Sequence, residues 1–195
     1  ESFNSLINLG GIYKDLGNLD QALAYTYKSL ELKPDSPVAL LNLGGIYKEL
    51  GQLDVALNFT LQSLKHKPDD LNALINLAGI YKDLGLLDLA FSCTQKSLEL
   101  SPNNHDVFIM LAGVYKDLGN LDEALSSTLR SLDLEPHSSK AFYSLGGIHM
   151  ALGDLDVARL NLLNAIKIDP HFYAAYYELS NILQSSEEAL QLARD

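Results

Sequence analysis

The sequence predicts an all-α solenoid built from antiparallel pairs of helices, and three observations lead to this prediction. The phrase Gly-Ile-Tyr-Lys starts at Gly11, Gly45 and Gly79, and the near copy Gly-Val-Tyr-Lys starts at Gly113, so the period is 34 residues. In each period, a glycine and a proline recur at fixed positions. Between them, apolar residues recur every three or four positions, as on one face of a helix. A fixed period of this size indicates stacked helical units.

The first unit shows how each helix begins and ends. Its first apolar stretch covers 6–16 and ends at Gly17, because glycine adopts the left-handed conformation that closes a helix. Its second stretch covers 22–32 and is closed by Pro34, because proline cannot continue a helix. Asp20 lies at the start of the second helix, where a carboxylate satisfies free backbone N–H groups and the helix dipole.

The remaining units follow in the same register. The predicted repeats are 3–36, 37–70, 71–104, 105–138 and 139–172, followed by a partial sixth repeat or capping helices over 173–195. The turn glycine recurs in each later repeat, as Gly51, Gly85, Gly119 and Gly153. Hydrophobic residues make up 47% of the 195 residues, which is enough for a core shared between units, so we predict one elongated domain.

This pattern closely resembles the tetratricopeptide repeat (TPR). That family's unit has Leu-Gly, an aromatic residue three positions on, a turn glycine, an alanine in the second helix and a proline near the end. The first unit carries them as Leu9, Gly10, Tyr13, Gly17, Ala22 and Pro34. The fifth unit departs from the pattern at His149, which replaces the tyrosine. The resemblance implies a right-handed superhelix whose first helices line a concave inner face and whose second helices face outward.

The resemblance also implies which residues line that inner face. An apolar row holds Ile7, Leu41, Ile75, Ile109 and Tyr143. A row of glycines follows four residues on, at Gly11, Gly45, Gly79, Gly113 and Gly147. A row of lysines, each followed by an acid, consists of Lys14, Lys48, Lys82 and Lys116 with Asp15, Glu49, Asp83 and Asp117. The lysine row stops at Met150 and Ala151 in the fifth unit.

The glycine row has two interpretations. Glycine inside a helix costs about 0.5–1 kcal/mol relative to alanine, so five glycines in this slot need a reason. In the functional interpretation, a bound chain approaches the helix backbone closely. In the structural interpretation, adjacent first helices pack tightly, or recent duplication copied one ancestral residue. The sequence leaves both open.

Asparagines form a further inner-face row at Asn8, Asn42 and Asn76, which ends at Met110 and Ser144. A side-chain amide both donates and accepts hydrogen bonds, so such a row could hold the backbone of an extended peptide. The row resembles the asparagine ladder in the repeat domain of O-linked N-acetylglucosamine transferases, although asparagine is also common there in ordinary repeats. A clamp for acidic chaperone tails is not expected, because Ile7 and Gly11 occupy the slots where that clamp carries Lys and Asn.

The C-terminal region departs from the repeat pattern in two ways. Six aromatic residues gather there, most of them expected in the core, with Tyr143 and Tyr177 as candidate partner anchors: Phe142, Tyr143, Phe172, Tyr173, Tyr176 and Tyr177. After Leu183 the turn glycine is missing, and Ser185-Ser186-Glu187-Glu188 is typical of a capping box that starts a final short helix.

No group of residues predicts catalysis. The five histidines lack metal-ligand spacing and are expected to be solvated, at His66, His105, His137, His149 and His171. Cys93 has no base partner in the sequence, so we expect a small buried or half-buried side chain rather than a nucleophile. The Gly-Gly pairs lie inside helices, not in a phosphate-binding loop. We predict no enzyme activity, no cofactor and no metal site in this chain.

Charge and targeting signals restrict the partners and the compartment. The net charge of −11 repels phosphate backbones, so we expect no nucleic-acid partner, and it favours basic ones. No run of 18 apolar residues predicts a membrane span. No secretion signal is visible, and one cysteine cannot form an internal disulfide, which together favour a cytoplasmic location. The chain starts at Glu1 rather than at a methionine, so we expect it to derive from a longer protein that could have carried a leader.

Three hypotheses of function follow. In the leading hypothesis, the chain is a protein–protein interaction scaffold that binds a peptide or helix of a partner in its concave groove. In the second, it is the substrate-recruiting arm of a larger enzyme, such as a glycosyltransferase. In the third, it is a self-assembling structural solenoid, because the end units expose stacking faces.

Overall fold

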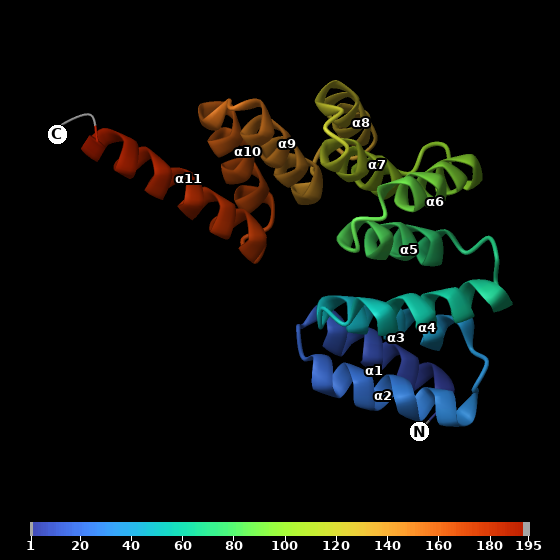
Figure 1. The fold of residues 1–195 in the computed structure, drawn as a ribbon. Helices are drawn as coiled ribbons and strands as arrows, with labels where there is room; N and C mark the ends of the chain where they lie inside the picture. Colours follow the sequence, from blue (N-terminus) through green and yellow to red (C-terminus); the bar gives the residue numbers. More distant parts are fainter. Residues whose placement is uncertain (1, 193–195) are drawn as a thin grey trace. The chain divides into compact units, whose positions relative to one another are not determined.

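The computed structural model describes residues 2–192, with side chains through residue 184. Over these residues every regular element is a helix, and the helices alternate along the chain in antiparallel pairs (Figure 1). The chain divides into two compact units, unit 1 (Glu1–Pro102) and unit 2 (Asn103–Asp195). The sequence predicts one elongated domain, and the division falls next to the predicted junction between the third and fourth repeats. A boundary there fits a repeat architecture, in which each repeat contacts only its neighbours.

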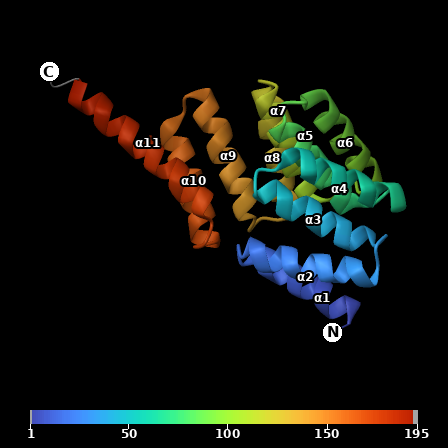
Figure 2. The same cartoon turned by 60° about the horizontal axis from the view of Figure 1, so that its bottom comes forward.

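Unit 1 consists of three helix pairs. They are α1 (Phe3–Asp15) with α2 (Leu19–Leu32), α3 (Pro37–Glu49) with α4 (Leu53–His66), and α5 (Leu71–Asp83) with α6 (Leu87–Leu100). The two helices of each pair pack on each other, and each second helix packs on the next first helix. The first helices α1, α3 and α5 also contact one another in a row. Figure 1 shows α1 next to α3, and Figure 2 shows α1, α2 and α3 with the bottom of that view turned forward.

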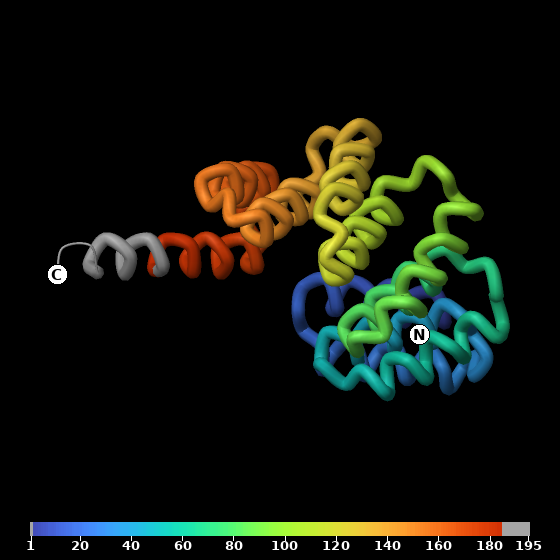
Figure 3. Tube along the Cα trace, turned by 45° about the horizontal axis from the view of Figure 1, so that its top comes forward, coloured from blue at the N-terminus to red at the C-terminus, as the bar shows by residue number. Residues whose placement is uncertain are grey.

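Unit 2 continues the alternation. It consists of α7 (His105–Asp117) with α8 (Leu121–Leu134), α9 (Ser139–Leu152) with α10 (Leu155–Ile168), and the long helix α11 (Tyr173–Leu192). Helix α11 packs on α10, and α7 contacts α9. The helix start predicted at Ser185 is wrong, because α11 runs from Tyr173 to Leu192 as one helix. Figure 3 shows the first part of α11, in red, following α10 along the chain. The capping-box side chains of 185–188 lie outside the described residues.

The turn glycines close the first helix of each pair as predicted. All five have positive φ, between 72° and 84°. At the first turn, the Gly17 N–H donates to the Lys14 carbonyl and the Asn18 N–H to the Tyr13 carbonyl, both at 2.8 Å. These bonds satisfy carbonyls that the helix end leaves free. A side chain other than glycine would be strained at these positions.

Side-chain caps begin the first helices, a feature that the sequence analysis did not identify. Each cap oxygen accepts the backbone N–H three residues on, at 3.2–3.4 Å, from Ser2, Ser36, Asp70, Asn104 and Ser138. In the second helix α2, the cap bond comes from Asn18, whose Oδ1 accepts the Gln21 N–H at 3.2 Å. Asp20 lies in the first turn as predicted, where its charge complements the helix dipole.

The core of each pair is built around small side chains. The alanine of every second helix is fully buried, at Ala22, Ala56, Ala90, Ala124 and Ala158. It faces the small slot of the first helix, where a Cβ on Gly10 would lie only 2.5 Å from Thr26 Oγ1. The buried Thr26 hydroxyl donates to the Ala22 carbonyl at 2.7 Å, so no polar group is left unsatisfied there. This close packing fixes where each first helix presents its inner face.

Candidate functional site

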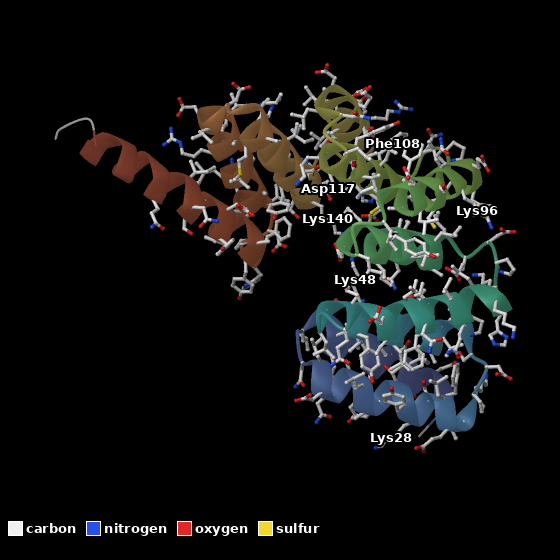
Figure 4. All side chains as sticks on the ribbon, in the orientation of Figure 1. Lys28, Lys48, Lys96, Phe108, Asp117 and Lys140 are labelled. Atoms are coloured by element: carbon white, nitrogen blue, oxygen red, sulfur yellow. The ribbon has the colours of Figure 1, made fainter. Side chains whose placement is uncertain are left out.

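The predicted inner-face residues of unit 1 surround a cavity of about 310 Å³. The residues that line it come from α1, α3 and α5, one helix from each of three successive repeats: Lys14, Gly45, Lys48, Glu49, Asn76 and Asp83. Four of them, Lys14, Gly45, Lys48 and Asn76, are predicted site residues. Figure 4 shows Lys48 at the end of α3, on the side of that helix next to α5.

The charges around the cavity do not pair only within each repeat. Lys14 Nζ lies 3.7 Å from Asp15, and Lys82 Nζ lies 3.4 Å from Asp83, each lysine with the acid that follows it. Lys48 Nζ instead lies 3.6 Å from Asp83 of the next repeat. Asp83 therefore has two lysines close to it, whereas Glu49 forms no ion pair with any described residue.

Glu49 is also the carboxylate of the cavity whose pKa is shifted. Glu49 is an exposed residue, and the partial desolvation of its carboxyl by the surrounding side chains raises the pKa above its ordinary value of 4.5. The nearby charge of Lys14 acts in the opposite direction, Asp15 adds to the increase, and Lys48 again opposes it. The cost of removing the Glu49 charge from water is therefore not fully offset by its neighbours.

Asn76 has a structural bond as well as a place in the cavity. Its Nδ2 donates to Thr60 Oγ1 at 3.0 Å, which links α5 to the preceding second helix α4. In unit 2, Ser144 occupies the same slot and its Oγ lies 3.3 Å from Thr128 Oγ1. This slot therefore joins neighbouring repeats, and only part of the Asn76 amide remains for a ligand. Asn8 is exposed and Asn42 is half-buried.

At Gly11, Gly45 and Gly147, the glycine row does not arise from tight packing of adjacent first helices. A Cβ on Gly11 would meet nothing within 4 Å. On Gly45 it would lie 3.8 Å from the Lys14 side chain, and on Gly147 it would lie 3.7 Å from Lys116 Nζ, both ordinary contacts. Alanine would fit at all three positions. Gly79 is buried, so tight packing still applies there, whereas duplication and the approach of a bound chain remain as explanations for Gly11, Gly45 and Gly147.

The apolar row is half-buried throughout, at Ile7, Leu41, Ile75, Ile109 and Tyr143. Half-buried side chains pack partly against neighbouring residues and still leave part of their surface accessible to a partner. Tyr143 differs from the others because its ring meets Phe172 edge-on, with centroids 5.0 Å apart. It packs with Phe142 and Phe172 against the buried cluster of unit 2.

The three tyrosines of α11 lie outside this core. Tyr173, Tyr176 and Tyr177 are 73%, 45% and 67% exposed, so the expectation that most of the six aromatics are core residues holds for only three of them. The residue equivalent to Tyr176 in the first repeat is Leu6, which is buried with only 3% of its surface exposed. Within the described residues, no second helix follows α11.

The lysine row of unit 2 ends as the sequence predicts. Lys116 Nζ lies 3.9 Å from Asp117, and Met150 and Ala151 take the places that Lys48 and Glu49 hold in unit 1. Met150 packs against the buried cluster of unit 2. The inner face of this unit is therefore less charged at the equivalent positions.

The remaining candidate residues show no arrangement for chemistry. Two of the five histidines, His105 and His149, are half-buried rather than solvated, and His149 Nδ1 lies 3.5 Å from Asp154. Burial raises the pKa of the Cys93 thiol, which disfavours the nucleophilic thiolate. Among the described residues, no three His, Cys, Asp or Glu side chains gather in a way that could hold a metal ion. None of the described helices has the length and apolar character needed to cross a membrane.

Comparisons with known proteins agree with this geometry. A family model of the tetratricopeptide repeat matches residues 3–36, 37–70, 71–104 and 139–172, and a second model of the same repeat matches 93–126. A search of curated proteins finds no match. The likeness to the repeats of O-linked N-acetylglucosamine transferases is not confirmed by these comparisons.

Three solved structures illustrate the similarity in fold. The thermophilic TPR protein TTC0263 of Thermus thermophilus is 23% identical with a TM-score of 0.85, over 94% of this chain and 100% of that one. MamA of Desulfovibrio magneticus is 17% identical with a TM-score of 0.63, over 87% and 96%. YrrB, described as a TPR protein with an unusual peptide-binding site, is 23% identical with a TM-score of 0.57, over 91% and 97%. At these identities the likeness shows the fold alone.

Proposed function

Because the chain belongs to the tetratricopeptide repeat family, we propose that it is a protein-interaction scaffold that holds a peptide or helix of a partner protein along the inner face of its first helices. The observation that carries this proposal is the cavity of unit 1, to which three successive repeats contribute side chains. A surface assembled from equivalent positions of neighbouring repeats suits an extended ligand, which meets the same slots at regular intervals.

The half-buried apolar row supplies the contact area for such a ligand. Leu41 and Ile75 occupy equivalent positions on the neighbouring helices α3 and α5 and are partly accessible. Apolar anchors surrounded by polar groups commonly carry most of the binding energy at protein interfaces. The lysines, acids and Asn76 beside them would then set the orientation of the partner. The fold of YrrB, whose description includes a peptide-binding site, gives a precedent for peptide binding by this architecture.

The test is a capture experiment with paired variants. Leu41→Glu/Ile75→Glu places two charges on the inner face, and bound proteins are compared with those of the unchanged chain by mass spectrometry. Leu61→Glu/Leu89→Glu is the matched control, because these leucines are 44% and 47% exposed on the second helices. We expect specific partners to be lost only from the inner-face variant. Equal recovery by both variants, at unchanged helicity in circular dichroism, would contradict the proposal.

A second candidate function is self-association through the first repeat, and one observation favours it. Ile12 is 54% exposed, whereas its equivalents Ile46 and Ile80 are fully buried by the preceding repeat. Leu16 on the same helix is 73% exposed. Either a second copy of the chain or a repeat that precedes Glu1 in a longer protein would cover this face. Light scattering over a wide concentration range tests the idea, since a dimer that Ile12→Glu abolishes would support it and a monomer throughout would exclude it.

A further inference from the structure

We propose that the cavity of unit 1 receives a basic side chain of the bound partner, with Glu49 as its ion-pair partner and Asn76 as a second hydrogen-bond acceptor. This inference rests on the proposed function, because it names the chemistry that the inner face selects. It concerns one defined place on that face, the cavity lined by residues of α1, α3 and α5.

The pairing of charges points to a cationic ligand group. Lys14, Lys48 and Lys82 each have a carboxylate within 3.7 Å, and Asp83 has two of these lysines. Glu49 lines the same cavity and forms no ion pair with any described residue. A cation placed in the cavity therefore gains a carboxylate that is not already engaged. An anion would have to compete with the carboxylates that already lie beside the lysines.

The hydrogen-bonding capacity of the cavity points the same way. Asn76 Nδ2 donates one of its two N–H groups to Thr60 Oγ1, and no described residue donates to Asn76 Oδ1. The acceptors that the cavity offers a ligand are the Glu49 carboxylate and the Asn76 carbonyl oxygen. An arginine side chain offers five N–H donors in a planar fork, and a lysine offers three. A basic side chain thus matches both acceptors at once.

The size and the electrostatic setting of the cavity agree with this ligand. A volume of about 310 Å³ is at the lower end of ligand pockets, which suits one side chain rather than a large molecule. The chain as a whole carries a net charge of −11, which attracts basic segments. Partial desolvation already raises the pKa of Glu49, and a bound cation would offset that cost by stabilising the ionised carboxylate.

The same place in unit 2 lacks these features. Met150 and Ala151 replace Lys48 and Glu49, and Glu178 takes the slot of Asn76. The carboxylate that α3 provides in unit 1 therefore has no counterpart on α9. The combination of Glu49 on α3 with Asn76 on α5 is therefore found in unit 1, whereas unit 2 has a single carboxylate, Glu178 on α11, at the equivalent positions.

The test uses three peptides that differ at one residue: acetyl-Gly-Ser-X-Ser-Gly-amide with X as Arg, Glu or Gln. Each is titrated into the isotope-labelled chain, and NMR follows the Gly45 backbone amide and the Asn76 side-chain amide. We expect the arginine peptide to shift both signals and the other two peptides to shift them far less. In Glu49→Gln the affinity for the arginine peptide should fall about tenfold or more, the effect expected when a hydrogen bond to a charged group is lost. Glu99→Gln, an exposed carboxylate on α6, is the matched control and should bind as the unchanged chain does.

Two results would overturn the proposal. One is a response to the glutamate peptide that equals or exceeds the response to the arginine peptide, which would make the lysines the ligand-binding groups. The other is an arginine response that Glu49→Gln leaves intact. The scaffold proposal fails on a different result, in which Leu41→Glu/Ile75→Glu leaves partner capture unchanged. That result does not depend on which peptide shifts the NMR signals.

Discussion

The inner faces of unit 1 and unit 2 differ, although one packing scheme builds both. Each pair buries the alanine of its second helix completely, as Ala56 in unit 1 and Ala158 in unit 2 illustrate. On the inner face, unit 1 presents Lys48 and Glu49 beside a cavity, whereas unit 2 presents Met150 at the first of these positions, packed against a buried cluster. The core therefore fixes where inner-face side chains lie, and a few surface positions decide what they recognise.

The largest predicted effect tests the shared core. Ile80→Ala in unit 1 and Ile148→Ala in unit 2 each truncate a side chain with 0% exposure. Each should lower the free energy of unfolding by about 2–5 kcal/mol, because buried contacts are lost and a cavity is left. Urea denaturation of both variants measures this. Ile12→Ala is the control, and since Ile12 is 54% exposed it should cost less than about 1 kcal/mol. Similar losses for all three variants would contradict the burial pattern.

The next prediction transfers the chemistry of unit 2 into unit 1. Lys48→Met/Glu49→Ala gives α3 the residues that α9 carries. The arginine peptide should then bind about tenfold more weakly, or not measurably, because the carboxylate is absent. Titration calorimetry or the same NMR signals report the change. Unchanged binding would mean that the difference between the two faces has no part in recognition.

Alanine substitutions at two glycines, one within α3 and one just after it, should change the stability of the chain in opposite directions. Gly51 has φ +72°, so Gly51→Ala should destabilise the chain by about 1 kcal/mol or somewhat more. Gly45 lies inside the helix, and a Cβ there would make an ordinary 3.8 Å contact with the Lys14 side chain. Gly45→Ala should therefore stabilise the chain by about 0.5–1 kcal/mol. Gly147→Ala should do the same in unit 2, and thermal unfolding distinguishes the signs.

If Gly45→Ala also weakens partner capture while Gly147→Ala does not, the glycine in unit 1 serves close approach of the ligand. If both are stabilising and neutral for binding, duplication accounts for the glycines at these two positions.

The smallest predicted effect concerns protonation. The pKa of Glu49 is raised above its ordinary 4.5 by partial desolvation, so the folded chain binds this proton more tightly than the unfolded chain does. The resulting contribution to stability is present at low pH and is lost as the pH rises through the folded pKa. NMR titration should show Glu49 titrating above its ordinary value of 4.5. Because a cation binds the ionised form, the affinity for the arginine peptide should fall as the pH drops through the same range, and addition of that peptide should lower the pKa of Glu49.

The sequence predicts the helix pairs well because their signals are local. The turn glycines require positive φ, and the prolines stop the second helices, so the boundaries follow from single residues. The small residues of the core also follow from the repeat, since Gly10 and Ala22 occupy the same places in each period.

The parts that the sequence did not predict depend on neighbours in space. The pairing of Lys48 with Asp83 crosses to the next repeat, so adjacency in sequence gave the wrong partner and did not identify Glu49 as unpaired. The bond from Asn76 to Thr60 is likewise between repeats. The exposure of Tyr173 and Tyr176 depends on what packs against α11, which the local sequence does not specify.

The most direct test of the central claim is hydroxyl-radical footprinting of the chain with and without a captured partner, read by mass spectrometry. The scaffold account predicts that the partner protects Leu41 and Ile75 on the first helices and leaves Leu61 and Leu89 on the second helices as reactive as before. Protection of Leu61 and Leu89, with Leu41 and Ile75 unchanged, would place the partner on the opposite surface and contradict the account.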